Sequence, residues 1–412
     1  MIKHSPDKTI SWRRNLIFIW IGQLLAMAGT SLVIPFIPIY MRAVLKLADE
    51  GQRAWGVSLF YSVGMLSFCI SNPLWGALGD RFGRKLMLLR AYFVTGITFP
   101  AMMFMPNLTM LIIMRFVASM FSGTVAAAQT LTAVTTPDKH QGFALGCLSA
   151  AFWSGNMLGM VLGGIVVHYC GYTTAFMLCG ACFITSGLLT LLFVEERFVP
   201  PVKKPETVKP RRNFILPDFS MAIWILLGVM FMLPLARRCD EPFLPLLVEI
   251  IGGMERAALN TSWITASAAL GGILSGAFFG RLSDKYKPLM LAVPAMMTAG
   301  GFMLLQSVSG SLLLLGVARF MVFFAAGGLE PIFLAMISHT VKSDLRGTVF
   351  GWSASARMFG GMAGALIGGA AVSVLGTRGV FAFAGIIMLM LSGLIVPAIK
   401  KVEQLKKQLY TA

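Results

Sequence analysis

Twelve long apolar runs divide this chain, and they constrain its fold more than any other feature. Each is about as long as the roughly 20 apolar residues that a helix needs to cross a bilayer. They cover residues 15–41, 55–79, 86–105, 109–133, 142–168, 174–194, 220–250, 260–283, 289–308, 311–337, 346–373 and 380–399. They do not alternate in polarity as the strands of a membrane β-barrel would. The sequence therefore predicts an all-α integral membrane protein with twelve transmembrane helices.

The composition excludes two other classes of protein. Of the 412 residues, 57% are hydrophobic and 12% are charged, whereas soluble domains are about 25% charged. An ordinary soluble enzyme is therefore excluded, and the high hydrophobicity excludes a disordered chain. The sequence contains no nucleophile–base pair, metal-ligand cluster or phosphate-binding loop. We therefore expect no enzyme activity, no catalytic residue, no metal site and no cofactor.

The excess of basic residues orients the chain. A net charge of +17 would by itself suggest a nucleic-acid partner. If the N-terminus lies inside, 24 of the 34 Lys and Arg residues fall in inside loops or termini and five fall outside. The positive-inside rule then places both termini in the cytoplasm of a multi-pass protein of the cell (inner) membrane. We expect a monomer in the lipid bilayer and no nucleic-acid partner.

The two halves of the chain repeat each other. Asp80 aligns with Asp284 at an offset of 204 residues, within similar segments that follow the second and eighth runs. Six glycines of the fifth run recur in the eleventh at an offset of 205: Gly142, Gly146, Gly155, Gly159, Gly163 and Gly164 match Gly347, Gly351, Gly360, Gly364, Gly368 and Gly369. Parallel six-helix repeats are typical of secondary transporters. We predict a six-helix bundle at 1–194, a cytoplasmic linker at 195–219 and a second six-helix bundle at 220–412.

Motifs at these positions resemble those of the major facilitator superfamily, and within it the twelve-helix drug:proton antiporters. Residues 76–85 read GALGDRFGRK and fit the loop motif GxLxDRxGRK at every specified position. A glycine pattern of antiporters is met by Gly146, Gly155, Gly159, Gly163 and Gly164, with Met160 at its proline position. The resemblance implies the major facilitator fold, a small-molecule substrate and coupling to a proton gradient without a cofactor.

The same resemblance implies a cytoplasmic gate. Its residues would be Gly76, Asp80, Arg81, Arg84 and Asp284. Asp80 would pair with Arg84 and cap a neighbouring helix, and these contacts would latch one conformation. Alternatively, the basic residues of this loop only follow the positive-inside rule. The repeated glycines would let helices approach closely, either as static packing or as sliding surfaces.

Charged residues inside the predicted helices are costly and usually functional. We predict the three acids as proton carriers, namely Glu330, Asp240 and Glu241. We predict the arginines as substrate or charge partners, namely Arg237, Arg238, Arg357 and Arg115, whose repeat counterpart is Arg319. Arg237 precedes Asp240 by three residues and Glu241 by four, so the three can share one helix face. The alternative is a static buried ion-pair cluster that only fixes helix packing.

These features predict a proton-coupled secondary transporter that exports amphipathic or drug-like compounds by alternating access. A second hypothesis is a transporter of a specific polar anion such as a siderophore or an organic acid, because guanidinium groups bind carboxylates in a bidentate manner. A third is a membrane enzyme or a sensor without transport activity, and no motif in the sequence favours the enzyme.

Overall fold

A computed structural model describes residues 11–47, 49–137, 140–196, 219–283, 286–340 and 346–411. Nearly all of these residues are helical, and none of them forms a strand. Seven helical segments of this described part are long and apolar enough to cross a membrane by length and composition. The predicted all-α membrane fold is confirmed.

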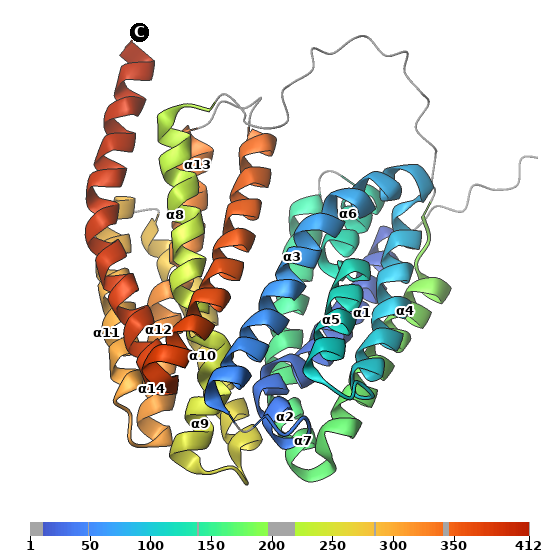
Figure 1. The fold of residues 1–412 in the computed structure, drawn as a ribbon. Coiled ribbons are helices and arrows are strands. Elements are labelled where there is room, and N and C mark those ends of the chain that lie inside the picture. Colours follow the sequence, from blue (N-terminus) through green and yellow to red (C-terminus); the bar gives the residue numbers. More distant parts are fainter. Residues whose placement is uncertain are drawn as a thin grey trace, which may run out of the picture. The chain divides into compact units, whose positions relative to one another are not determined.

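The chain forms two compact units. The first comprises Met1–Ile34 and Ser67–Lys203, and the second comprises Pro35–Leu66 and Lys204–Ala412. The first unit holds α1 (Trp12–Val33), α4 (Arg84–Met102), α5 (Leu108–Phe121), α6 (Thr124–Thr135) and α7 (Gln141–Phe193) (Figure 1). The second holds α2 (Ile37–Ala43), α8 (Met221–Arg238), α9 (Leu244–Gly252), α10 (Ala257–Ser283), α11 (Pro288–Ser307), α12 (Leu312–Gly327), α13 (Leu329–Thr340) and α14 (Arg346–Thr411). Helix α3 (Glu50–Phe82) contributes to both units.

The two longest helices each contain two predicted spans. The chain turns within α7 at Gly171 and within α14 at Gly376, where φ is +82° and +72°. Glycine adopts this left-handed region without the strain that a Cβ atom would cause. The two glycines are 205 residues apart, so the repeat extends to the turns. When these two turns are counted as breaks, and the pairs α1–α2, α5–α6, α8–α9 and α12–α13 are each counted as one interrupted span, the described residues contain two sets of six helical spans, as predicted.

Other predicted spans are interrupted within their length, at matching places in the two repeats. The 3₁₀ turn η1 (Ile34–Phe36) separates α1 from α2, and η3 (Glu241–Phe243) separates α8 from α9. Each turn contains a proline, which lacks the N–H that a continuous helix requires. The α5–α6 and α12–α13 junctions also interrupt single predicted spans. These breaks place irregular backbone at membrane depth, where transporters commonly form their sites.

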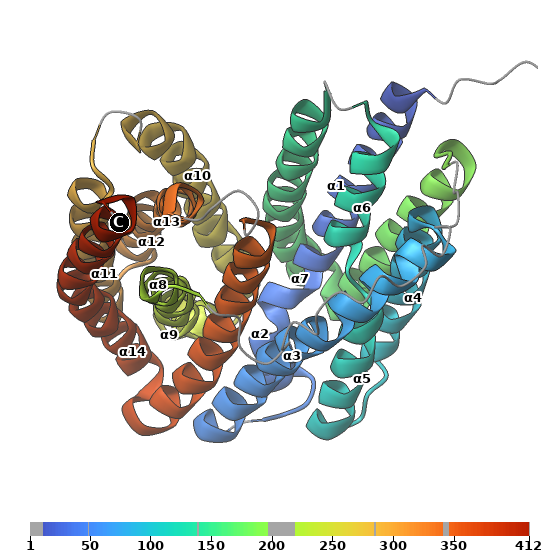
Figure 2. The same ribbon diagram turned by 90° about the horizontal axis from the view of Figure 1, so that it is seen from above.

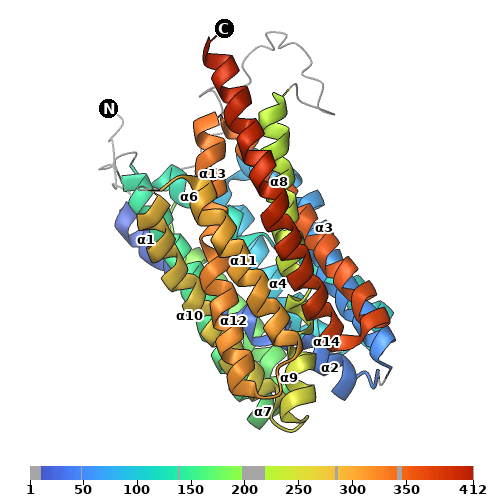
Figure 3. The same cartoon turned by 90° about the vertical axis from the view of Figure 1, so that its left-hand side faces the viewer.

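Glycines set the closest helix contacts in both units. A Cβ atom at Gly155 or Gly159 of α7 would overlap the backbone of α1. In the second unit, a Cβ atom at Gly360 or Gly364 of α14 would overlap the backbone of α8 in the same way, and one at Gly368 would overlap the backbone of Cys239, the residue after α8. Helix α8 accordingly lies between the two arms of α14 (Figure 2). On another side of this unit, α12 packs against both α10 and α11 (Figure 3).

Alanine at Gly159 is expected to destabilise the protein, whereas alanine at Gly146 is not. The added methyl group would overlap the backbone at Ala28 in the first case and meets no atom within 4 Å in the second. Overpacking of this kind costs about 1–3 kcal/mol. The midpoint of heat-induced loss of the monodisperse protein, measured in detergent, should fall for Gly159→Ala alone. Equal midpoints for the two variants would show that the α1–α7 contact tolerates the extra volume.

Candidate functional site

The bend between α8 and α9 gathers several of the predicted charges. Pro234 lies inside α8, and Pro242 lies in η3. Proline removes a backbone donor and clashes with the preceding turn, so the seventh span does not continue as one helix. Arg237 and Arg238 end α8, while Asp240 and Glu241 lie at the bend.

Asp240 forms a fully buried ion pair with Arg319 of α12. The exposed fraction is 0% for the Asp240 side chain and 2% for that of Arg319. Arg319 also donates to Gln306 Oε1 of α11 at 3.3 Å. The spacing predicts that Arg237 and Asp240 can share one helix face, whereas the described ion pair joins Asp240 to Arg319, which is 79 residues away. Breaking one half of such a buried pair is costly because it leaves an uncompensated charge.

Phe323 of α12 lies close to two guanidinium groups. The Arg237 group is 5.0 Å from the centre of the Phe323 ring, and the Arg319 group is 5.1 Å from it. Cations within about 6 Å of an aromatic face are attracted by its quadrupole. Phe323 was not predictable from the sequence, because one phenylalanine among many in an apolar helix is not distinguished from the others.

The other two predicted acids are more exposed than Asp240. Glu241 lies 3.6 Å from Arg238, and both side chains are partly accessible. Glu330 forms an ion pair with Arg357 of α14, and their side chains are 49% and 27% exposed. Glu330 lies in the first turn of α13, just after the break from α12, where the positive end of the helix dipole stabilises a negative charge. The structure thus brings together Glu330 and Arg357, which the sequence proposed separately.

Arginines of the first unit contact aromatic rings. Arg115 of α5 is buried and lies 5.9 Å from the ring centre of Phe99. Arg90 lies on α4 with its guanidinium 3.5 Å from the Trp75 ring centre. Arg90 also donates to the Ser122 carbonyl at 3.1 Å. Because Ser122 is the C-cap residue that follows α5, this bond satisfies a carbonyl for which the helix end provides no partner.

The predicted gate is only partly described. The side chain of Asp80 and the whole of Asp284 lie outside the described residues. Gly76 meets no atom that would obstruct a Cβ, and the Arg81 guanidinium lies 5.3 Å from the Phe82 ring centre. The backbone N–H groups of Arg84 and Lys85 donate to the Glu196 carboxylate at 3.0 and 2.7 Å. Glu196 thus caps α4, a role that its place in the predicted linker did not indicate.

A second group of polar contacts lies where α2, α3, α9 and the turn of α14 meet in the second unit. Arg42 of α2 forms an ion pair with Glu249 of α9, whose side chain is buried. Glu50 of α3 accepts hydrogen bonds from both the backbone N–H and the hydroxyl of Thr377. No sequence pattern joins Arg42 to Glu249 or Glu50 to Thr377, because the partners of each contact lie far apart in the chain.

A comparison with models of protein families identifies the family of this chain. The model of the Major Facilitator Superfamily matches residues 19–255 and 226–409. The chain belongs to this superfamily. The superfamily is one of membrane transporters, which excludes the alternative of a membrane enzyme.

Relatives and solved structures agree with that assignment. The chain is 29% identical over 375 residues to the "Multi-drug resistance efflux pump PmrA homolog" of Lactococcus lactis, covering 91% of this chain and 92% of the relative. It is 30% identical over 381 residues to "Multidrug resistance protein MdtG" of Escherichia coli O1:K1 / APEC, covering 91% and 92%. The crystal structure of the nucleoside transporter NupG has a TM-score of 0.73 at 13% identity, covering 93% of this chain and 99% of NupG. This superfamily transporter is therefore a homologue of multidrug efflux pumps.

Proposed function

We propose that this superfamily member exports amphipathic, drug-like compounds in exchange for protons by alternating access. The names of its relatives support export of such compounds. Proton coupling is supported chiefly by one observation, the partly exposed Glu330–Arg357 pair at the α12–α13 break. Among the three acids at the bend and the break, this carboxylate combines the greatest exposure with an arginine partner.

The pair offers a direct coupling mechanism. While Arg357 stays beside Glu330, the ionised carboxylate is stabilised by the guanidinium. A conformational change that separates the two groups would favour protonation of Glu330, because the carboxylate would lose the charge-assisted contact that stabilises its ionised form. Return of Arg357 would expel the proton on the other side of the membrane. Asp240, which forms a buried ion pair with Arg319, would instead stabilise the bend between α8 and α9.

Transport in proteoliposomes tests the proposal. With the lumen made acidic, an exporter that exchanges protons for substrate should accumulate a lipophilic fluorescent cation, and a protonophore should abolish the accumulation. Vesicles without protein and vesicles without a gradient are the controls. Accumulation only with the gradient reversed would contradict antiport, and no accumulation with either gradient would contradict proton coupling of this substrate class.

The position of Arg237 supports a second candidate function, the transport of polar anions. Its guanidinium lies over Phe323, and the described ion pairs at the bend use Arg238 and Arg319 instead. A substrate carboxylate could bind Arg237 in a bidentate manner. A transporter of polar anions is then expected to be inhibited by organic acids and not by lipophilic cations. The reverse pattern of inhibition would exclude it.

We also propose that the protein is a monomer of the inner membrane with both termini in the cytoplasm. The distribution of Lys and Arg between the apolar runs supports this orientation. A green fluorescent protein fused after Ala412 should fluoresce, and alkaline phosphatase fused at the same place should be inactive. An active phosphatase fusion would reverse the proposed orientation.

A further inference from the structure

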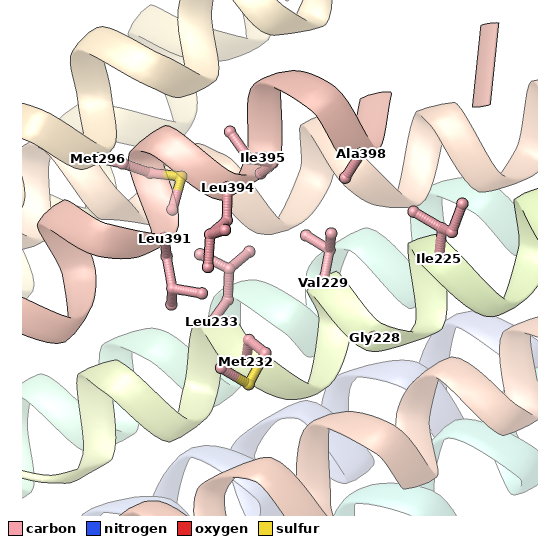
Figure 4. A pocket seen from close by; sticks show the side chains of 10 residues that line it. All are labelled: Ile225, Gly228, Val229, Met232, Leu233, Met296, Leu391, Leu394, Ile395 and Ala398. Atoms are coloured by element: carbon pink, nitrogen blue, oxygen red, sulfur yellow. The ribbon is translucent and has the colours of Figure 1, made fainter. Parts of the chain in front are cut away.

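An apolar groove opens between three helices of the second unit. Its volume is about 210 Å³, and Figure 4 shows the side chains that line it. The lining residues are Ile225, Gly228, Val229, Met232 and Leu233 of α8, Met296 of α11, and Leu391, Leu394, Ile395 and Ala398 of α14. None of these side chains carries a polar group other than a thioether sulfur, so the groove fits hydrocarbon.

The groove is accessible from outside the protein. Gly228 is exposed, and a Cβ atom there would meet nothing within 4 Å. Leu394, on the opposite wall, is 63% exposed. Exposed apolar side chains on a transmembrane helix are suited to contact with lipid tails, which are as apolar as leucine. The volume is below the roughly 300–1,000 Å³ of sites for drug-sized molecules, which favours a slender chain over a bulky substrate.

Positively charged side chains, those of Lys400 and Lys401, follow one end of the groove along α14. Leu394, Ala398 and Lys401 follow one another at intervals of four and three residues along α14, so they lie on the same helix face. Lys401 is about 4.5 Å beyond Ala398 along the axis. Lys400 and Lys401 are both exposed, and residues 400–407 contain four lysines against one acid, Glu403.

We propose that this groove binds an acyl chain of an anionic phospholipid whose headgroup contacts Lys400 and Lys401. The apolar lining takes the chain, and the lysines select the charge of the headgroup, as basic sites beside transmembrane helices do for anionic lipids. Bound lipid would join α8 to the second arm of α14. The inference depends on membrane insertion, which the superfamily establishes, and not on proton coupling or on the exported compound.

Lipid retention by the purified full-length protein tests this site. The protein in detergent is incubated with phosphatidylglycerol or with phosphatidylcholine of the same acyl chains, and bound lipids are counted by native mass spectrometry. Each lysine that contacts the headgroup should favour the anionic lipid roughly fivefold. We therefore expect clear retention of phosphatidylglycerol over phosphatidylcholine, and loss of that preference in the double variant Lys400→Ala/Lys401→Ala.

The groove itself is tested by filling it. Gly228→Leu places a side chain in the open space and should remove the tightly retained lipid of either headgroup. Gly393→Leu is the matched control, because Gly393 is an exposed glycine of α14 with equally open surroundings that does not line the groove. This variant should retain lipid like the wild type. If Gly228→Leu is not monodisperse on size exclusion, Leu394→Trp fills the groove from the opposite helix.

Two results would overturn the proposal. The first is equal retention of the two lipids by the wild-type protein, which would remove the role of the lysines. The second is undiminished retention of phosphatidylglycerol when a folded variant fills the groove, which would place the lipid elsewhere. Either result would leave the transport measurements unaffected, so failure of this site and failure of the proposed function are distinguishable.

Discussion

Liposomes that contain the Glu330→Gln variant should accumulate no more substrate under an imposed pH gradient than liposomes without protein. Glutamine has nearly the shape of glutamate but cannot bind and release a proton, so the gradient would no longer drive transport. Folding should be preserved, because Glu330 is 49% exposed and partly exposed ion pairs contribute only about 0–1 kcal/mol. Gradient-driven uptake and the thermal midpoint are the two measurements.

The control separates coupling from binding. Substrate counterflow, in which labelled substrate enters against unlabelled substrate without a gradient, needs substrate binding and alternation but no net proton movement. We expect counterflow to persist in Glu330→Gln. Glu255→Gln, which changes an exposed acid between α9 and α10, should behave like the wild type in both assays. Wild-type uptake under a gradient by Glu330→Gln would remove this residue from the coupling mechanism.

The largest change in stability is expected from Arg319→Met. It leaves the Asp240 carboxylate, whose exposed fraction is 0%, without its partner. Loss of one member of a buried pair costs about 3–5 kcal/mol, and about 2–4 °C of thermal midpoint accompanies each kcal/mol in a domain of 150–250 residues. The midpoint in detergent should therefore fall by roughly 10 °C, with a matching loss of monodisperse protein.

The double variant Asp240→Leu/Arg319→Met should recover most of that stability, because apolar pairs commonly replace buried ion pairs at little cost. Arg238→Met, at a partly exposed pair, should change the midpoint by far less. Equal stability of Arg319→Met and the double variant would show that the Asp240 charge is not what makes the single change costly. If the double variant still transports substrate under a proton gradient, Asp240 has only a structural role at the bend. If the double variant has lost proton-driven transport, Asp240 is again a candidate proton carrier.

Much of the fold follows directly from the apolar runs. A span of about 20 apolar residues satisfies its backbone only as a helix, and so the helical spans were predictable one by one. The kinks and turns between these helices were less predictable. Pro234 and Pro242 account for the kink between α8 and α9, whereas Gly171 and Gly376 do not differ in sequence from the many other glycines of the chain. Only their φ values distinguish the turns they form from the packing role of Gly159.

The pairing of charges could not be derived from the sequence. Spacing identifies neighbours on one helix, and it therefore linked Asp240 to Arg237. The partner that the structure gives, Arg319, belongs to another helix and reaches Asp240 through tertiary packing. Arg90 illustrates the same limit, because its contact with Trp75 depends on how α3 and α4 pack. Glu330 and Arg357 were both identified because charged residues are costly inside a membrane, but no sequence pattern indicated that they form an ion pair.

The assignment of residues 35–66 to the second unit has a consequence for the order of biosynthesis. Residues 35–66 leave the ribosome early, yet they belong to the second unit. Ser62 bonds to the Met362 carbonyl, which is made 300 residues later, and the Thr377 N–H that binds Glu50 follows after 327 residues. This segment, with its buried Arg53, therefore completes its contacts only when synthesis is nearly finished. Nascent chains released before α14 would leave these polar groups without their partners, which is a feature by which membrane quality control could recognise them.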